Sequence, residues 1–193
     1  MDTEKMTVVT LSVGIIGTCC YVLWADGRED CLVVDPGGEP ERIRKAAGGR
    51  RIAGILFTHG HFDHIAGASK LVDAETRVLI HPLDAPMLSD PDLNAGRELL
   101  RLDVTGPAPT DLVRDGQELE LAGLNIRVWH TPGHTPGSVC YEIGDHFFTG
   151  DTLFHHGWGR TDLPGGSEED LFRSLRRILP LSKEKKVHPG HDA

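Results

Sequence analysis

The chain has 193 residues, of which 39% are hydrophobic and 25% are charged, and its formal net charge is −9. This length allows one well-buried domain and is short for two, so we expect a single domain over residues 1–193. The acidic balance argues against a nucleic-acid partner, because phosphate binding needs a stripe of basic side chains. It does not exclude an anionic substrate, because divalent cations in a pocket reverse the local field.

The termini and the cysteines indicate where the protein resides. Apolar runs stay short of the roughly 20 residues that a membrane span needs, so we expect no membrane contact. Residues 1–6 are polar and acidic, unlike the start of a secretory signal peptide. Four cysteines lie in apolar, strand-like stretches without a C-x-x-C pair: Cys19, Cys20, Cys31 and Cys140. We interpret them as buried thiols of a cytoplasmic protein.

The first half of the chain predicts strands interleaved with helices. Apolar or alternating stretches predict strands at residues 7–13, 19–24, 31–34, 52–57 and 78–80, with a hairpin turn at Asp26-Gly27. Helices are expected at residues 39–47 and 64–73. Residues 82–109 are rich in Pro, Asp and Gly, and we expect an irregular surface excursion with one short helix.

The second half predicts a run of strands and one clear helix. Strands are expected at residues 118–121, 124–129, 138–143 and 146–148. The helix follows Ser167, a good N-cap with Asp170 as its capping-box partner. Its predicted apolar face consists of Leu171, Phe172, Leu175, Ile178 and Leu179. Strands and helices grouped in this way favour an α+β fold, with two sheets packed face to face and helices outside.

Residues that can bind a metal gather directly after the apolar strand at 52–57. The segment is Thr58-His59-Gly60-His61-Phe62-Asp63-His64. Small residues at positions 58 and 60 let the chain turn tightly and present successive imidazoles inward. A polar turn with solvated histidines is the alternative, and the density of ligand-type residues argues against it. Imidazole and carboxylate together suit borderline divalent ions such as zinc, iron or manganese.

This segment resembles the H-x-H-x-D-H signature of the metallo-β-lactamase superfamily. The family's further ligands match in order, with His134 in Pro-Gly-His-Thr-Pro-Gly, Asp151 in Thr-Gly-Asp and His191 in Pro-Gly-His. The resemblance covers nearly the whole chain. It implies an αββα sandwich of two mixed β-sheets flanked by helices, with the metal site at one edge.

The resemblance also implies two divalent metal ions, with zinc the first choice and iron or manganese the others. One ion would be held by His59, His61 and His134, and the second by Asp63, His64 and His191. Asp151 would bridge them. Two metals that share a water lower its pKa to about 7, which gives hydroxide at neutral pH. Asp63 and Asp151 are the predicted catalytic residues, and Asp63 would orient the nucleophile or pass its proton onward.

Two further residues are candidates for supporting roles. By the resemblance, Asp35 lies near the metal site as a partner of a ligand, whereas the alternative is a turn-forming Asp-Pro-Gly. Arg160 lies in Gly-Arg-Thr-Asp, which resembles the G-R-[ST]-D segment of glyoxalase II-like hydrolases and persulfide dioxygenases. It would bind a substrate carboxylate, or instead form a clamp with Asp162 or the backbone that shapes the loop.

Several other residues have plainer interpretations. Phe154 and Trp158 are expected to pack rather than to line the pocket. Six histidines outside the ligand set are expected to be structural or solvated: His81, His130, His146, His155, His156 and His188.

A carboxylate at position 151, where the β-lactamases commonly carry Cys, resembles glyoxalase II. The expected substrate is therefore a small acyl thioester or ester of the hydroxyacylglutathione type, rather than an antibiotic. Longer members of that family bind glutathione partly through a helical C-terminal region, and here the sequence ends two residues after His191, so it is either a short form or a truncated one. Glutathione as the thiol carrier stays open.

Two other activities stay open on the same ligand set. One is a persulfide dioxygenase with a single iron on His59, His134 and Asp151. The other is hydrolysis of a different ester, a lactone or a phosphoester. A monomer and a homodimer are both compatible with the sequence.

Overall fold

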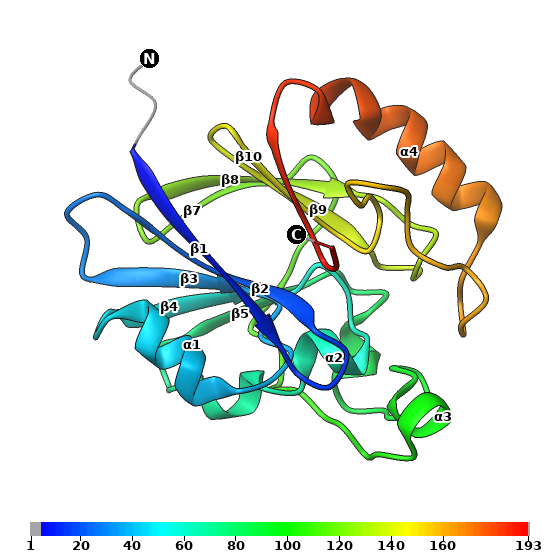
Figure 1. The fold of residues 1–193 in the computed structure, drawn as a ribbon, viewed down its shortest axis with the longest axis horizontal. Helices are drawn as coiled ribbons and strands as arrows, with labels where there is room; N and C mark the ends of the chain where they lie inside the picture. The colour runs from blue at the N-terminus through cyan, green and yellow to red at the C-terminus, as the bar shows by residue number, and fades with distance from the viewer. Residues whose placement is uncertain (1–4, 193) are drawn as a thin grey trace.

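Two β-sheets lie face to face in the structure, a computed structural model that describes residues 5–192 (Figure 1). The six-stranded sheet has the order β1-β2-β3-β4-β5-β6, and the five-stranded sheet has the order β11-β10-β9-β8-β7. The strands of the first sheet are β1 (Met6–Val13), β2 (Thr18–Ala25), β3 (Asp30–Val34), β4 (Arg51–Leu56), β5 (Arg77–Ile80) and β6 (Asp111–Leu112). Those of the second are β7 (Glu118–Leu121), β8 (Leu124–His130), β9 (Val139–Ile143), β10 (His146–Gly150) and β11 (Lys186–Pro189).

Both sheets are mixed, as the resemblance implies. In the first sheet β1, β2 and β3 pair antiparallel, whereas β3, β4, β5 and β6 pair parallel. In the second sheet only the edge pair β10–β11 is parallel. Since β9 runs antiparallel to both β8 and β10, the carboxyl ends of β8, β10 and β11 lie at the same edge.

The helices are α1 (Pro40–Ala47), α2 (Phe62–Ile65), α3 (Gly96–Leu100) and α4 (Glu168–Ser182). Figure 1 shows α1 on the outer side of the first sheet and α4 on the outer side of the second. Ile43 of α1 belongs to the cluster on the outer face of the first sheet, and Leu171 of α4 belongs to that of the second. The predicted αββα arrangement is therefore confirmed.

The main core fills the space between the sheets, where large side chains from both are buried. Its fully buried members include Tyr21, Leu32 and Leu56 from the first sheet, and Tyr141 and Phe148 from the second. All four cysteines are buried and none of them forms a disulfide. Among residues 5–192, no helix has both the length and the apolar character needed to cross a membrane. Residues 1–4, part of the polar start of the chain, lie outside the described residues.

Three predicted elements differ in the structure. The helix predicted at residues 64–73 is split into α2 and a 3₁₀ turn at Ala68–Lys70, because the N–H of Gly67 leaves the helix to donate to the carbonyl of Pro36 at 2.8 Å. Residues 82–109 are not all on the surface, since Leu88 and Asn94 are buried. The apolar face of α4 is only partly covered: Phe172 and Leu179 remain 37% and 41% exposed.

Candidate metal centre

The first group of ligand-type residues follows β4. After that strand ends at Leu56 the chain passes through Thr58, and His61 then serves as the extended N-cap of α2, whose first residues include Asp63 and His64. Gly60 is required for this path, because a Cβ there would lie 2.6 Å from the Cβ of Met87. The tight turn lets His59 and His61 project toward one point.

The second group comes from three loops at the matching edge of the other sheet. His134 lies between β8 and β9, Asp151 follows β10, and His191 follows β11. The parallel β10–β11 pair brings the last two together, and the N–H of Gly190 donates to the carbonyl of Gly150 at 2.8 Å. A Cβ at Gly190 would overlap Oδ1 of Asp151, so the approach of the two chains depends on glycine.

The seven predicted ligands meet in two groups of three around one carboxylate. One donor atom each from His59, His61 and His134 lies within 4.8 Å of the others, and the same holds for Asp63, His64 and His191. Asp151 stands between the groups. Its Oδ2 is 3.5 Å from Nε2 of His134 and 3.4 Å from Nε2 of His191, and its Oδ1 is 3.4 Å from Nε2 of His64.

The donor atoms fit a bound metal. Four buried polar atoms of this cluster have no hydrogen-bond partner among the residues described: Nε2 of His59, His61 and His64, and Oδ1 of Asp151. Buried polar atoms are rarely left unpaired, because each such atom costs about 1–3 kcal/mol. Imidazole nitrogens and carboxylate oxygens that converge without other partners are the ligands that zinc, iron and manganese accept.

The electrostatics favour the protonation states that a metal requires at His59, His61 and the two carboxylates, but not at His64 and His191. Burial, assisted by nearby His134, lowers the pKa of His61 to about 3, and burial lowers the pKa of His59 well below its usual value. Burial by itself would raise the pKa of Asp63 and Asp151, but the charge of His64 and the hydrogen bonds from His191 outweigh it and lower both. The site therefore holds neutral imidazoles at His59 and His61 beside ionised carboxylates. Burial is outweighed by these carboxylates at the other two rings: the pKa of His64 is raised well above its usual value and that of His191 to about 9, so a metal would have to displace their protons.

Asp35 contacts the ligands from behind. Its Oδ2 lies 2.9 Å from Nδ1 of His64, and its carboxylate accepts hydrogen bonds from Thr58 N at 2.8 Å and Thr58 Oγ1 at 2.6 Å. Thr58 Oγ1 is in turn 3.1 Å from Nδ1 of His59. One atom each of Asp35, His59 and His64 lie close enough together to share a metal ion. The oxygens of Asp35 are, however, already engaged in the hydrogen bonds just described. Its position fits the orienting role that the resemblance implies.

Sequence reasoning missed Asp84, which joins the ligand loops of the two sheets. This carboxylate is fully buried; Oδ2 accepts from Gly60 N at 3.0 Å and Thr135 Oγ1 at 2.7 Å, and Oδ1 accepts from Gly137 N at 2.7 Å. Burial raises its pKa, and the three donors oppose that rise. Asp84 lies in the stretch that the sequence predicts to be a surface excursion, and no pattern around it marks it as buried.

Thr18 was missed as well. Its Oγ1 donates to Oδ2 of Asp63 at 2.7 Å, and its side chain is fully buried at the start of β2. The hydroxyl thereby fixes one oxygen of a predicted catalytic carboxylate. A single Thr at the start of an apolar strand carries no recognisable signal in the sequence.

The side chain of Arg160 forms a clamp with Asp162, one of the two roles that the sequence left open. Its Nε and Nη2 donate to Oδ1 and Oδ2 of Asp162 at 2.6 and 2.7 Å, with both side chains more than half exposed. The carbonyl oxygen of Arg160, in contrast, lies 2.6 Å from Nδ1 of His134. The backbone of this residue thus contacts a predicted metal ligand, and the residue also lines the cavity beside the site.

The cavity over the ligands has a volume of about 320 Å³. Ile16, Leu99 and Leu163 contribute an apolar rim. Phe154 also lines it, and its ring lies edge-on to His191 with 6.0 Å between the centroids, so the expectation that Phe154 only packs is wrong. Trp158 does not line this cavity, but it is 52% exposed and so is not packed away either.

The remaining histidines lie outside the metal cluster. His81 stacks on His130 with 4.1 Å between centroids, and Nδ1 of His146 lies 2.7 Å from Nε2 of His188. His155 and His156 are exposed at the tip of the loop after Asp151.

Comparison with known proteins agrees with the geometry of the site. A family model described as Metallo-beta-lactamase superfamily matches residues 14–191. The chain is 31% identical to hydroxyacylglutathione hydrolase GloC of Haemophilus influenzae, over 96% of this chain and 91% of the relative.

Two solved structures are also similar. BLEG-1 B3 metallo-beta-lactamase superposes with a TM-score of 0.90 and 34% identity, covering 97% of this chain and 92% of that one. TTHA1623, solved in a di-iron-bound form, gives a TM-score of 0.82 and 35% identity, covering 96% of this chain and 93% of that one. The ordered ligand motifs, the two mixed sheets and these matches together establish that the chain belongs to the metallo-β-lactamase superfamily.

Proposed function

We propose that this metal-dependent hydrolase cleaves acyl thioesters of the hydroxyacylglutathione type with two divalent metal ions. The observation that carries the proposal is the carboxylate of Asp151, whose two oxygens lie between two complete groups of ligands. Zinc is our first choice for the metal, with iron or manganese as the others. Similarity to GloC supports a thioester as the substrate.

When bound, the metals supply Lewis acidity, which lowers the pKa of water and polarises a carbonyl. The protein's own groups then align the reaction. Asp63, ionised and fixed by the Thr18 hydroxyl, accepts a proton from the attacking water and passes it to the departing thiolate. The water oxygen becomes bonded to the carbonyl carbon, and the carbon–sulfur bond breaks. Asp35 holds the ring of His64, and Asp84 holds the backbone beside His61 and His134 through Gly60 and Thr135.

The first test is metal content per chain by elemental analysis, on protein purified without chelator or added metal. Close to two ions per chain, together with thiol release from S-D-lactoylglutathione, supports the proposal. Close to one ion, predominantly iron, with oxygen uptake on glutathione persulfide, would replace it with the dioxygenase.

A β-lactam is the second substrate to test, because BLEG-1 carries the name of a β-lactamase and is 34% identical. Asp151 argues against this activity by the resemblance to glyoxalase II. Hydrolysis of a β-lactam with no thiol release from any thioester would overturn the proposal in favour of an antibiotic substrate.

A further inference from the structure

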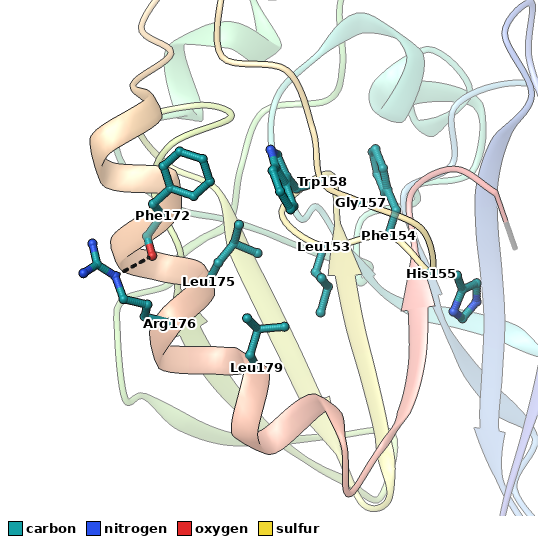
Figure 2. Close-up of a pocket in the computed structure, with 9 residues that line it drawn as sticks. All are labelled: Leu153, Phe154, His155, Gly157, Trp158, Phe172, Leu175, Arg176 and Leu179. Atoms are coloured by element: carbon teal, nitrogen blue, oxygen red, sulfur yellow. Dashed lines mark hydrogen bonds between the residues drawn. The ribbon is translucent and has the colours of Figure 1, made fainter.

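A second cavity, of about 650 Å³, lies between α4 and the loop that follows Asp151 (Figure 2). We call it the α4 groove. Its apolar walls are formed by Leu153, Phe154, Trp158, Phe172, Leu175 and Leu179. Figure 2 shows Trp158 facing Phe172 across the groove, with Phe154 on the side of Trp158 away from α4.

The hydrophobic cluster under α4 is complete without any group bound in the α4 groove. The cluster under α4 is completed by Leu171, Leu175 and Ile178, which are buried against the second sheet. Trp158 is nevertheless 52% exposed, and its ring meets that of Phe172 edge-on at 5.6 Å, so the exposed aromatics support each other. A cluster of exposed large apolar side chains marks a binding surface more often than a part of the fold.

The α4 groove shares a wall with the metal cavity. Phe154 lines both, and the loop that carries it is tied to the site because the N–H of Gly159 donates to the carbonyl of Asp151 at 3.0 Å. A ligand held at the metal centre can therefore extend over Phe154 and Trp158 toward Phe172 without leaving the protein surface.

The charges around the α4 groove select for a neutral or anionic ligand. The residues that line it include no Asp or Glu, although the chain carries a formal net charge of −9. Its charged member is Arg176, whose Nε donates to the carbonyl of Phe172 at 3.2 Å. His155 lies at the rim. A basic or strongly polar ligand would lose solvation here without gaining a partner.

We propose that the α4 groove binds the apolar acyl chain of the thioester whose carbonyl is cleaved at the metal centre. This inference rests on the proposed function and extends its substrate class to thioesters of medium-chain acids. The volume lies within the 300–1,000 Å³ range of small-molecule sites. A second copy of the chain is the less favoured occupant, because a stable dimer buries about 800 Å² on each partner, more than a narrow groove offers.

The test compares S-acylglutathiones from acetyl to decanoyl on the metal-loaded, full-length protein. We expect kcat/KM to rise about fourfold for each added methylene until the groove is filled. In Leu179→Glu and Trp158→Ser, the decanoyl-to-acetyl ratio of kcat/KM should fall at least tenfold. The matched control is Leu112→Glu, which changes a leucine of similar exposure (48%, against 41% for Leu179) on β6 and should leave the ratio unchanged.

A second measurement does not depend on hydrolysis. S-decylglutathione is a thioether that cannot be cleaved, and its binding is followed by isothermal titration calorimetry. The expected result is binding that Leu179→Glu weakens at least tenfold and Leu112→Glu does not. Circular dichroism verifies that each variant is folded, which is expected because both leucines are exposed.

The outcomes separate the two proposals. If no thioester is cleaved but the thioether binds in the manner expected, the proposed function fails and the assignment of the α4 groove to an apolar chain stands. If thioesters are cleaved with a flat dependence on chain length, or the thioether binds wild type and Leu179→Glu equally, the groove assignment is overturned. A dimer in light scattering that Leu179→Glu dissociates would also overturn it.

Discussion

The two sheets contribute their predicted metal ligands in different ways. The first sheet contributes His59, His61, Asp63 and His64 from one continuous turn after β4, whereas the second contributes His134, Asp151 and His191 from three separate loops. In the first case, local backbone geometry at Gly60 and the short helix α2 brings the side chains together. In the second, the side chains depend on contacts between residues far apart in sequence.

These long-range contacts are specific for each loop. The carbonyl of Arg160 positions His134, and Asp84 anchors the adjoining Thr135 and Gly137. The segment before His191 is held by the N–H of Cys19, which donates to the carbonyl of Gly190 at 2.7 Å, and by the Tyr21 hydroxyl, which donates to the carbonyl of Pro189 at 2.5 Å. The predicted ligands of the second sheet therefore depend on supporting residues that lie outside the sequence motifs.

The largest loss of activity is expected when a carboxylate is removed from either group of predicted ligands. Asp63→Ala removes a carboxylate of the continuous turn, and Asp151→Ala removes the carboxylate between the two groups. Each should abolish turnover while leaving the fold largely intact, because neither side chain belongs to the hydrophobic clusters. Turnover assays, metal analysis and circular dichroism test this. Wild-type rates in either variant contradict the proposed mechanism.

Asp84 and Asp35 support different groups of predicted ligands, so their substitution should affect metal binding at different sites. Asp84→Asn should weaken metal binding about 10–100-fold at the group of His59, His61 and His134, since Asp84 holds loops of both sheets. Asp35→Asn should weaken it by a similar factor chiefly at the group that includes His64. Chelator competition with one and two equivalents of metal distinguishes the sites. Equal loss at both sites in both variants would show that the supports are not separate.

A smaller effect is expected when the Arg160–Asp162 ion pair is broken, in the loop that follows Asp151. Both side chains are largely exposed, so breaking the pair should change the free energy of unfolding by no more than about 1 kcal/mol. If the pair shapes the loop, Arg160→Ala and Asp162→Ala should raise KM equally, and the double variant should add nothing. A rise in KM confined to Arg160→Ala would instead assign its guanidinium to substrate binding.

The smallest effect on turnover is expected for His188, next to the last ligand motif, which instead makes the stability of the protein depend on pH. Burial, with His146 nearby, lowers the pKa of His188 to about 4. The unfolded chain, with a histidine pKa of about 6.5, then binds more protons than the folded one, so the contribution of His188 to stability is full above pH 6.5. It is lost as the pH falls toward 4. Urea unfolding between pH 7.5 and 4 should show a shallower decline in His188→Gln than in the wild type.

The sequence predicts well the parts of the molecule that depend on local pattern. Apolar and alternating stretches predict β1 to β5 and β7 to β10, but the short edge strands β6 and β11 were not predicted. The N-cap role of Ser167, whose hydroxyl accepts from Asp170 N at 3.2 Å, is confirmed. The residues that meet at the candidate metal centre could be named in advance because their motifs are short and ordered along the chain. The prediction of one helix at residues 64–73 was wrong because the N–H of Gly67 donates to the carbonyl of Pro36. A hydrogen bond between segments so far apart in sequence leaves no local pattern.

The supporting residues could not be predicted for the same reason. Asp84 is buried by loops that lie 24 and 51 residues away in sequence, and Thr18 meets Asp63 across 45 residues. The exposure of Phe172 and Leu179 also depends on where the loop after Asp151 lies, which the periodicity of α4 does not encode. Periodicity shows which residues share a face, but the tertiary fold decides how much of that face is covered.

The loop from Thr152 to Gly159 is anchored to the metal centre at both ends. At the C-terminal end of the loop, the N–H of Gly159 donates to the carbonyl of Asp151, and the carbonyl of Arg160 lies against His134. The tip of the loop carries the exposed His155 and His156. Such a segment is a natural point for grafting, because both anchors stay in place when the tip between them is lengthened or replaced. Exchange of this tip would therefore alter the wall that faces α4 and leave the ligands where they are.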